Sequence, residues 1–266
     1  MLMEVKNNFK YFIKIILCNL KSAFEYRKSF VIQTVFMMVN NCFFLIFWSV
    51  VFNINGKNIN GIEMKDILYL WSIPTISYGM AYFFFGGIKE LSTKIITGGL
   101  DIYLTQPKSV FLSVITSRSD FSAFGDFAYG LLLSIIVSEN IIHFLEIMFY
   151  SVIACIIMIS TLTIIMSLST WLGDVKEIAE KYEHNFLINF STYPEAIYGN
   201  ITKFILYTIV PAGYIVHLPI KLLGNFTIKG LLILILATSI YVCIAILIFK
   251  KVLVKYESGN SMSMKG

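Results

Sequence analysis

Polar residues inside the apolar runs of this sequence are the ones whose types could do chemistry, and four of them are carboxylates. Asp126, Glu146, Glu180 and Glu183 stand inside apolar runs or at their ends. An ionisable side chain in such a run is costly to bury, so it marks an ion or substrate pathway or pairs with a neighbour. We expect Asp126 to be solvated or paired with Arg118, with a pathway role as the alternative. Glu146 is expected to reach water.

Two amides form a second polar position. Asn40 and Asn41 lie in the middle of another apolar run. Amides at that depth either hydrogen-bond to a neighbouring helix or line a water-accessible path. Both roles stay open for these asparagines and for Asp126, and the residue types favour contact between helices for Asn40 and Asn41.

Motifs for catalysis, nucleotide binding or metal binding are missing from the sequence. It has no G-x-x-x-x-G-K-[ST] phosphate loop, no H-E-x-x-H and no G-x-S-x-G. The three histidines, His143, His184 and His217, are expected at ordinary interfacial positions, and the four cysteines form no C-x-x-C pair. We therefore expect no enzyme activity, no metal site and no cofactor bound by this chain. Transport of a compound against its concentration gradient would need energy from a partner protein or from an ion gradient.

The elements that position these residues must be membrane helices. The chain is 57% hydrophobic and 14% charged, whereas a soluble domain is roughly 25% charged. The net charge of +5 comes without a soluble basic domain, so it reflects membrane topology rather than a nucleic-acid partner. The sequence predicts an all-α integral membrane protein with one domain over residues 1–266.

Six transmembrane helices are predicted, because a helix needs about 20 residues to cross the apolar core of a bilayer. Five apolar runs supply crossings at 30–52, 67–87, 121–138, 144–172 and 231–249. Lys and Arg gather before the first span, after the second and after the last, so both termini are predicted to be cytoplasmic in the cell membrane. An even number of crossings then requires one more, which we place at 178–194.

The segments outside the spans have their own predicted forms. Residues 1–28 have apolar residues at three- and four-residue spacing opposite lysines, which predicts an interfacial amphipathic helix, although a basic leader that only sets topology is the alternative. Residues 256–266 are predicted to be a disordered tail. Residues 195–228 are predicted to be a broken, re-entrant region in the outer half of the membrane.

Prolines and a tyrosine mark that outer re-entrant region. Tyr193 and Pro194 begin it within the stretch YPEAIY, and Pro211 and Pro219 interrupt the apolar residues that follow. Proline lacks the backbone N–H that a continuous helix needs. This region therefore cannot be a single clean span, and we expect it to pack against the helix bundle.

A polar loop at residues 89–118 is predicted to lie on the cytoplasmic side, between the second and third spans. Gly98 and Gly99 would break a helix there, Asp101 could accept backbone N–H groups at a helix start, and Pro107 would end the following turn. A short helix at the membrane face is expected. The alternative is that this loop is solvated and only sets the topology.

This loop resembles an element of the permease subunits of ABC-2 type transporters. A subgroup of about 260 residues has G-x-L-D-x-x-L-x-x-P after the second span, and here Gly98, Leu100, Asp101, Leu104 and Pro107 occupy every fixed position. The amphipathic N-terminal helix, the six spans, YPEAIY and IVPAGYIVHLP follow in the family's order. The resemblance therefore covers most of the chain.

The resemblance implies a permease subunit of an ATP-binding cassette exporter that moves a drug-like, peptide or other amphipathic compound out of the cell. It implies a separate ATPase subunit, which binds ATP and Mg, and a second permease copy or a sister permease within the surrounding lipid. The coupling helix that contacts the ATPase would include Gly98, Gly99, Leu100, Asp101, Leu104 and Pro107. A gradient-driven transporter or channel is the alternative, although few buried carboxylates are available for it, and a membrane enzyme is a more distant one.

Overall fold

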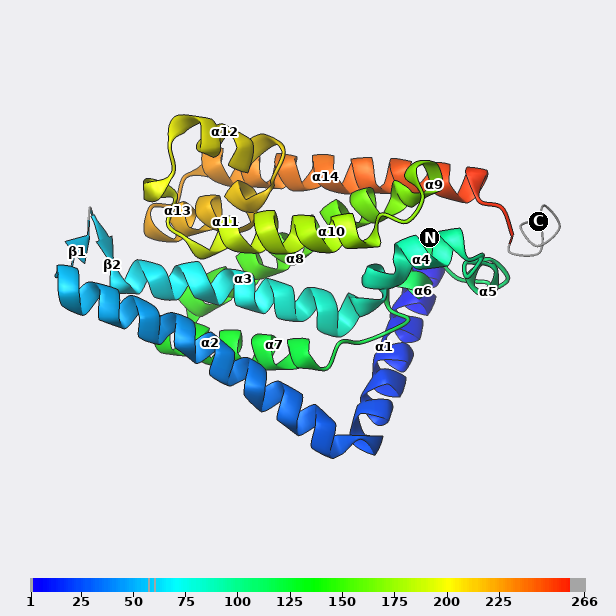
Figure 1. The fold of residues 1–266 in the computed structure, drawn as a ribbon, viewed down its shortest axis with the longest axis horizontal. Helices are drawn as coiled ribbons and strands as arrows, with labels where there is room; N and C mark the ends of the chain where they lie inside the picture. Colours follow the sequence, from blue (N-terminus) through cyan, green and yellow to red (C-terminus); the bar gives the residue numbers. More distant parts are fainter. Residues whose placement is uncertain (1, 57, 60, 259–266) are drawn as a thin grey trace.

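The computed structural model describes residues 2–56, 58–59 and 61–258. Long helices run side by side along one axis, and a two-stranded hairpin marks one end of the bundle (Figure 1). This hairpin, β1 (Asn58–Ile59) paired with β2 (Ile62–Glu63), was not predicted from the sequence. The all-α class is confirmed apart from this small antiparallel pair.

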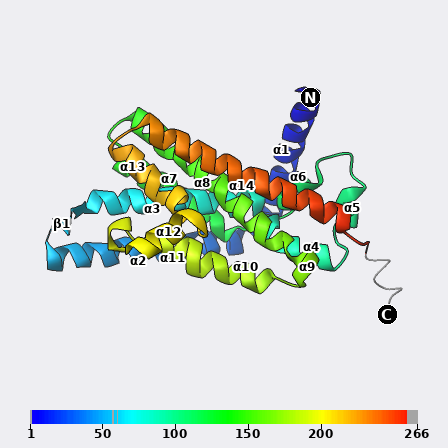
Figure 2. The same cartoon turned by 90° about the horizontal axis from the view of Figure 1, so that it is seen from above.

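The N-terminal helix lies across the other end of the bundle. Helix α1 (Leu2–Glu25) meets α2 (Arg27–Asn55) at Tyr26 and projects away from the bundle axis (Figure 2). The Asn19 amide donates hydrogen bonds to the Thr116 carbonyl at 3.2 Å and the Ser119 hydroxyl at 3.0 Å. Apolar side chains such as Phe9 and Leu17 remain exposed. This geometry suits the predicted interfacial helix, whose place at a membrane surface stays a prediction.

Three helices form the centre of the bundle. Helix α3 (Met64–Phe85) packs along α7 (Ser122–Val137) and α8 (Ile141–Ser167), and α7 also packs against α2. A capping box between Glu63 and Asp66 begins α3, because each side chain accepts a hydrogen bond from the other residue's backbone N–H. The short α9 (Ser169–Leu172) follows α8 at the same end as α1.

The loop predicted at 89–118 folds into several short helices instead of one. They are η1 (Gly86–Glu90), α4 (Leu91–Ile96), α5 (Asp101–Leu104) and α6 (Val110–Ile115). Gly98 follows the end of α4 and Pro107 follows the end of α5, as the sequence predicted for the region around Gly98. We call residues 98–107, which contain α5, the 98–107 segment.

The fifth predicted span is one helical stretch with a widened turn in its middle. It comprises α10 (Lys176–Tyr182), the π-helix η2 (Glu183–Ile188) and α11 (Asn189–Thr192). A π-turn adds a residue to the helical repeat and so changes which side chains face the bundle.

The region predicted as re-entrant is broken and bent. A 3-10 turn, η3 (Glu195–Ile197), precedes α12 (Asn200–Thr208), and then η4 (Gly213–His217) and α13 (Leu218–Gly224) follow. The two helical parts meet at 87°. Pro211 lies in the break between them and Pro219 in the first turn of α13. The last helix, α14 (Ile228–Lys255), packs along α8.

The prediction of six membrane crossings is supported in part. By length and composition, three described helices could cross a membrane, at Arg27–Ile54, Ile141–Leu172 and Ile228–Lys255, and the bent pair α12 with η4–α13 could be a fourth. The runs predicted at 67–87, 121–138 and 178–194 lie on α3, α7 and α10–α11. Six crossings and cytoplasmic termini stay predictions.

Both ends of the described chain lie at the end of the bundle that carries α4, α5 and α6 (Figure 1). At the start of the tail predicted to be disordered at 256–266, the Tyr256 and Ser258 side chains are hydrogen-bonded to Asp101, and the disorder of the tail stays a prediction. Residues 259–266 lie outside the described residues.

Candidate functional site

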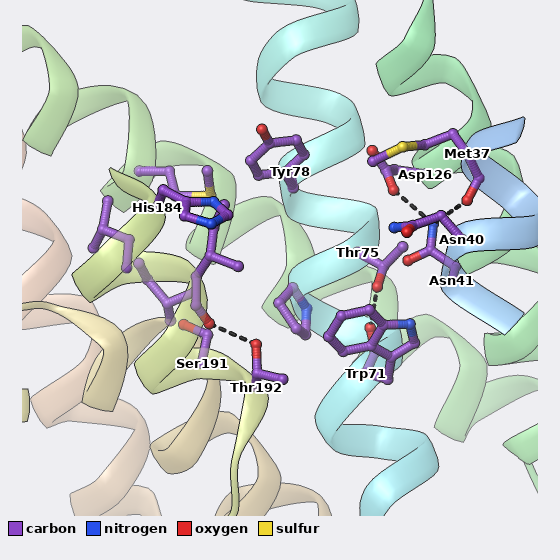
Figure 3. A pocket seen from close by; sticks show the side chains of 15 residues that line it. Met37, Asn40, Asn41, Trp71, Thr75, Tyr78, Asp126, His184, Ser191 and Thr192 are labelled. Atoms are coloured by element: carbon purple, nitrogen blue, oxygen red, sulfur yellow. Dashed lines mark hydrogen bonds between the residues drawn. The ribbon is translucent and has the colours of Figure 1, made fainter. Parts of the chain in front are cut away.

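A cavity of about 250 Å³ lies inside the bundle, between α2, α3 and α7 on one side and η2 and α11 on the other (Figure 3). We call it the bundle cavity. Its polar lining includes three residues singled out from the sequence, Asn40, Asn41 and Asp126. Its aromatic and basic lining includes Trp71, Tyr78 and His184.

A buried hydrogen bond joins two of the predicted site residues. Asn41 Nδ2 donates to Asp126 Oδ1 at 2.7 Å and to the Met37 carbonyl at 3.0 Å (Figure 3). The Tyr129 hydroxyl donates to the Asn41 carbonyl at 3.4 Å. These bonds link α2 to α7, and Asn41 and Asp126 are 2% and 3% exposed.

The expectation that Asp126 is solvated or paired with Arg118 is wrong. Arg118 pairs with Glu90, and Asp126 is buried beside Asn41. Close packing of α2 on α7 explains this depth, because a Cβ at Gly125 would lie 2.6 Å from the Thr34 carbonyl oxygen. Only glycine permits the two backbones to approach so closely.

Asn40 differs from its neighbour. Its side chain is exposed in the chain as described, and it lines the bundle cavity beside Asn41 (Figure 3). Adjacent positions on a helix point about 100° apart, so the two amides cannot share one set of partners.

The opposite wall comes from the π-helix and the helix after it. His184, Ser191 and Thr192 line the bundle cavity there, and the Thr192 hydroxyl donates to the Ile188 carbonyl at 2.7 Å (Figure 3). His184 lines the bundle cavity with an exposed side chain, and its interfacial position stays a prediction. His217, in contrast, is not interfacial, because it is 3% exposed and its Nε2 hydrogen-bonds to the Phe190 carbonyl at 3.0 Å.

Helix α3 contributes two aromatic residues and a threonine to the cavity lining. Trp71, Thr75 and Tyr78 follow each other at four- and three-residue spacing, which places them on one helix face. The Trp71 ring stacks on Phe44 of α2 with centroids 3.7 Å apart. We missed these residues from the sequence, and their helical spacing within an apolar run was the available signal.

A second buried carboxylate lies nearer to the end that carries α4. Glu183 of η2 is 5% exposed. On α3, the ring of Tyr82 faces Lys89, whose Nζ lies 3.8 Å from the ring centroid and 3.3 Å from Asp120 Oδ2. The predictions for Glu180 and Glu183 treated both as entering the fifth span, and the structure buries only Glu183.

The 98–107 segment is the second candidate site. Gly98 has a φ of +78°, a conformation that glycine adopts without strain, and it redirects the chain after α4. Leu100 is fully buried and Gly98 is buried too, so these residues anchor the segment to the bundle. Gly99 is partly buried and Pro107 is exposed.

Asp101 is the first residue of α5, and its expected role at a helix start stays a prediction. Its carboxylate accepts hydrogen bonds from the Tyr256 hydroxyl at 3.0 Å and the Ser258 hydroxyl at 2.7 Å. Burial and the nearby Asp101 carboxylate raise the pKa of Tyr256 to about 12, so its hydroxyl is a donor at neutral pH. Asp101 thereby ties the 98–107 segment to the chain that leaves α14.

Other contacts hold the same segment. The Tyr11 hydroxyl of α1 donates to Gln106 Oε1 at 3.1 Å. Beyond the segment, the rings of Phe111 on α6 and Phe249 on α14 lie 5.1 Å apart. Two apolar side chains of α5, Ile102 and Leu104, are 69% and 44% exposed.

The predicted outer residues gather around the bent region. Tyr193 ends α11, Pro194 precedes η3, and Glu195 accepts a hydrogen bond from the Tyr207 hydroxyl at 3.0 Å. Glu195 also pairs with Lys221 of α13 at 2.7 Å. Glu195 therefore joins both arms of the bend.

Metal ligands do not converge in the part of the chain that the structure describes, where no three His, Cys, Asp or Glu residues form a group. Asp126 and Glu183 are candidates for binding or coupling roles.

Comparison with known proteins gives one family match. The model of the ABC-2 family transporter proteins matches residues 35–260, which include both candidate sites. No curated protein and no solved structure matches the chain. Because the family match spans most of the sequence, the chain belongs to the ABC-2 family of transporter proteins.

Proposed function

We propose that this chain is the membrane subunit of an ATP-driven exporter that moves an amphipathic compound out of the cell. Membership of the ABC-2 family makes it a membrane transport subunit and implies an ATP-binding cassette ATPase as its partner in general. In this proposal the ATPase holds ATP and Mg, and two permease chains, identical or sister, form the pathway in the cell membrane.

The observation that carries the proposal is the set of contacts around the 98–107 segment. Asp101 joins it to Tyr256 beyond α14, Gln106 joins it to α1, and buried Leu100 joins it to the bundle core. A displacement of this segment would therefore act on the first and last helices and on the core together. Such rigid contacts transmit a push from an ATPase into movement of packed helices.

In this proposal the ATPase contacts the exposed side of α5. Ile102 and Leu104 are apolar, exposed and located at the end of the bundle that also holds both ends of the described chain. We propose that they enter a groove of the ATPase, with Pro107 nearby. In many protein interfaces a few residues that fill pockets of the partner carry most of the binding energy.

The test is co-purification with a co-expressed ATP-binding cassette ATPase, the kind of partner that the family implies. The double substitution Ile102→Glu and Leu104→Glu should reduce the recovered ATPase at least about tenfold, which corresponds to about 1.4 kcal/mol. Leu172→Glu is a matched control, because Leu172 is 69% exposed on α9 at the same end. Full recovery with the double variant, or equal loss with the control, would reject the assigned surface.

A gradient-driven transporter is the alternative function. The observation that favours it is the burial of two carboxylates, Asp126 and Glu183, within the bundle. Buried carboxylates of this kind carry protons or ions in gradient-driven carriers. Transport by the purified chain in liposomes without any ATPase, driven by a proton gradient, would support this alternative.

A further inference from the structure

We propose that the bundle cavity binds a small amphipathic amine, with its ammonium group on Asp126 and its apolar part against the aromatic wall of α3. This inference deepens the proposed function, because the ligand would belong to the class of compound that is exported. It rests on the geometry of the cavity and on one buried oxygen atom.

The Asp126 carboxylate uses only one of its oxygens within the described chain. Oδ1 accepts the hydrogen bond from Asn41 at 2.7 Å, whereas Oδ2 is buried and has no hydrogen-bond partner among the described residues. Asp126 is only 3% exposed, and it lines the cavity (Figure 3). An unpaired buried carboxylate oxygen is costly, so a donor from a ligand would relieve that cost.

The charge around the cavity favours a cation. No lysine or arginine is among the described residues that line it, and Asp126 forms no ion pair in the described part of the chain. His184 on the opposite wall is the one basic side chain of the described lining. A carboxylate with no ion-pair partner selects an ammonium group, whose N–H donors form short, charge-assisted hydrogen bonds with it.

The aromatic wall suits the rest of such a ligand. Trp71 and Tyr78 line the same cavity, and the stack on Phe44 fixes the Trp71 ring. Aromatic faces attract cations and also cover apolar groups. The indole Nε1 of Trp71 is buried without a partner among the described residues, so an acceptor oxygen on a ligand would find a donor there.

The size of the cavity limits the ligand. Its volume of about 250 Å³ is below the roughly 300–1,000 Å³ of pockets for drug-sized molecules. The occupant is therefore a small amine, or the amine end of a longer molecule whose remainder lies outside the cavity.

The test uses the purified full chain in lipid nanodiscs and two probes of the same shape. Binding of 4-phenylbutylamine, which is cationic at neutral pH, is compared with 4-phenylbutan-1-ol by isothermal titration calorimetry. We expect the wild-type chain to prefer the amine at least about tenfold, the usual scale of one charge-assisted contact. Equal affinity for both probes, or no binding of either, overturns the proposal.

Substitutions then assign the preference. Asp126→Asn keeps an oxygen for Asn41 and removes the charge, so the tenfold preference should disappear. Glu146→Gln is the matched control, because it removes an exposed carboxylate of α8 outside the cavity lining, and it should keep the preference. A preference that survives in Asp126→Asn contradicts the assignment.

A second variant covers the case in which Asp126→Asn does not fold, which a thermal melt would reveal. Tyr78→Leu removes an aromatic face and keeps the carboxylate, so it should weaken amine binding several-fold, and unchanged binding would count against the proposed wall. These assays contain no ATPase. Loss of amine binding would therefore leave the co-purification result for α5 intact, and the reverse also holds.

Discussion

The Tyr256 hydroxyl donates a hydrogen bond of 3.0 Å to Asp101 Oδ1, which connects the end of the last helix to a short helix 155 residues earlier in the chain. Contacts of this range cannot form until both segments are in place. The bond makes the position of the 98–107 segment depend on α14, and α14 packs along α8 in the bundle.

Tyr256→Phe should loosen the 98–107 segment without unfolding the bundle. One hydrogen bond to a carboxylate is lost, at a cost of about 1.5–3 kcal/mol at most. Amide hydrogen exchange should speed up at 98–107 and stay unchanged in α8. In a complex with the proposed ATPase, ATP hydrolysis should continue while transport falls.

The matched control for that change is Tyr26→Phe. Tyr26 is 70% exposed between α1 and α2, so loss of its hydroxyl should alter neither exchange nor coupling. If Tyr256→Phe behaves like this control, the connection through Asp101 has no mechanical role.

Asn41→Leu should destabilise the protein by about 1–3 kcal/mol, because it leaves Asp126 Oδ1 buried without its donor. Thermal unfolding in detergent measures this change. Adding Asp126→Leu should restore part of the loss, since replacing both polar partners removes the unpaired group. Gln33→Leu on the exposed face of α2 is the control. If the double variant loses as much stability as the two single variants lose together, a direct bond between Asn41 and Asp126 is contradicted.

Gly125→Val should separate α2 from α7 and lower stability by about 1–3 kcal/mol or more, as in other overpacked cores. A Cβ at Gly125 would meet Thr34 backbone oxygen at 2.6 Å, whereas a Cβ at Gly199 would meet nothing within 4 Å. Gly199→Val therefore serves as the control in thermal unfolding. Similar melting temperatures for both variants would show that the close approach is not needed.

Acid should weaken the ion pair between Glu90 of η1 and Arg118. Burial would raise the pKa of Glu90, but the hydrogen bond from Arg118 and the charge of Lys94 outweigh it and hold the pKa below the ordinary 4.5. The folded chain therefore stabilises the ionised Glu90 carboxylate. Its contribution to the stability of the fold is present above pH 4.5 and is lost as the pH falls through the lowered pKa.

The corresponding variant is Glu90→Gln. At pH 7 it should be less stable than the wild type by at most about 1 kcal/mol, as for a partly exposed ion pair, and near pH 3 the difference should vanish. Glu177→Gln, in the exposed pair with Lys181, is the control and should show little change at either pH. A difference that persists in acid would contradict the role of the Glu90 charge.

Much of the fold could be predicted because lipid imposes a simple rule. Long apolar runs form helices that satisfy their own backbone, so the runs at 30–52, 144–172 and 231–249 coincide with long apolar helices. The break near Pro211 could be predicted for the same reason, since proline removes a helical hydrogen bond.

The candidate site could be predicted only in part. Asn41 and Asp126 were singled out because they are polar within apolar runs, but their bond spans 85 positions and no local pattern pairs them. The π-helix that turns His184 toward the cavity adds one residue to a turn, and hydropathy does not report such a change. Asp101 was recognised through the resemblance, while its partners lie in a segment whose composition predicted disorder.

Helix α5 is the proposed place where the ATPase acts. A photo-crosslinking residue at position 102, in the complex co-expressed with the ATPase, tests this directly. We predict a covalent adduct with the ATPase from position 102 and none from position 172 on α9, which is equally exposed at 69%. Absence of the adduct at position 102 in an intact complex, or an equal adduct at position 172, would contradict the account.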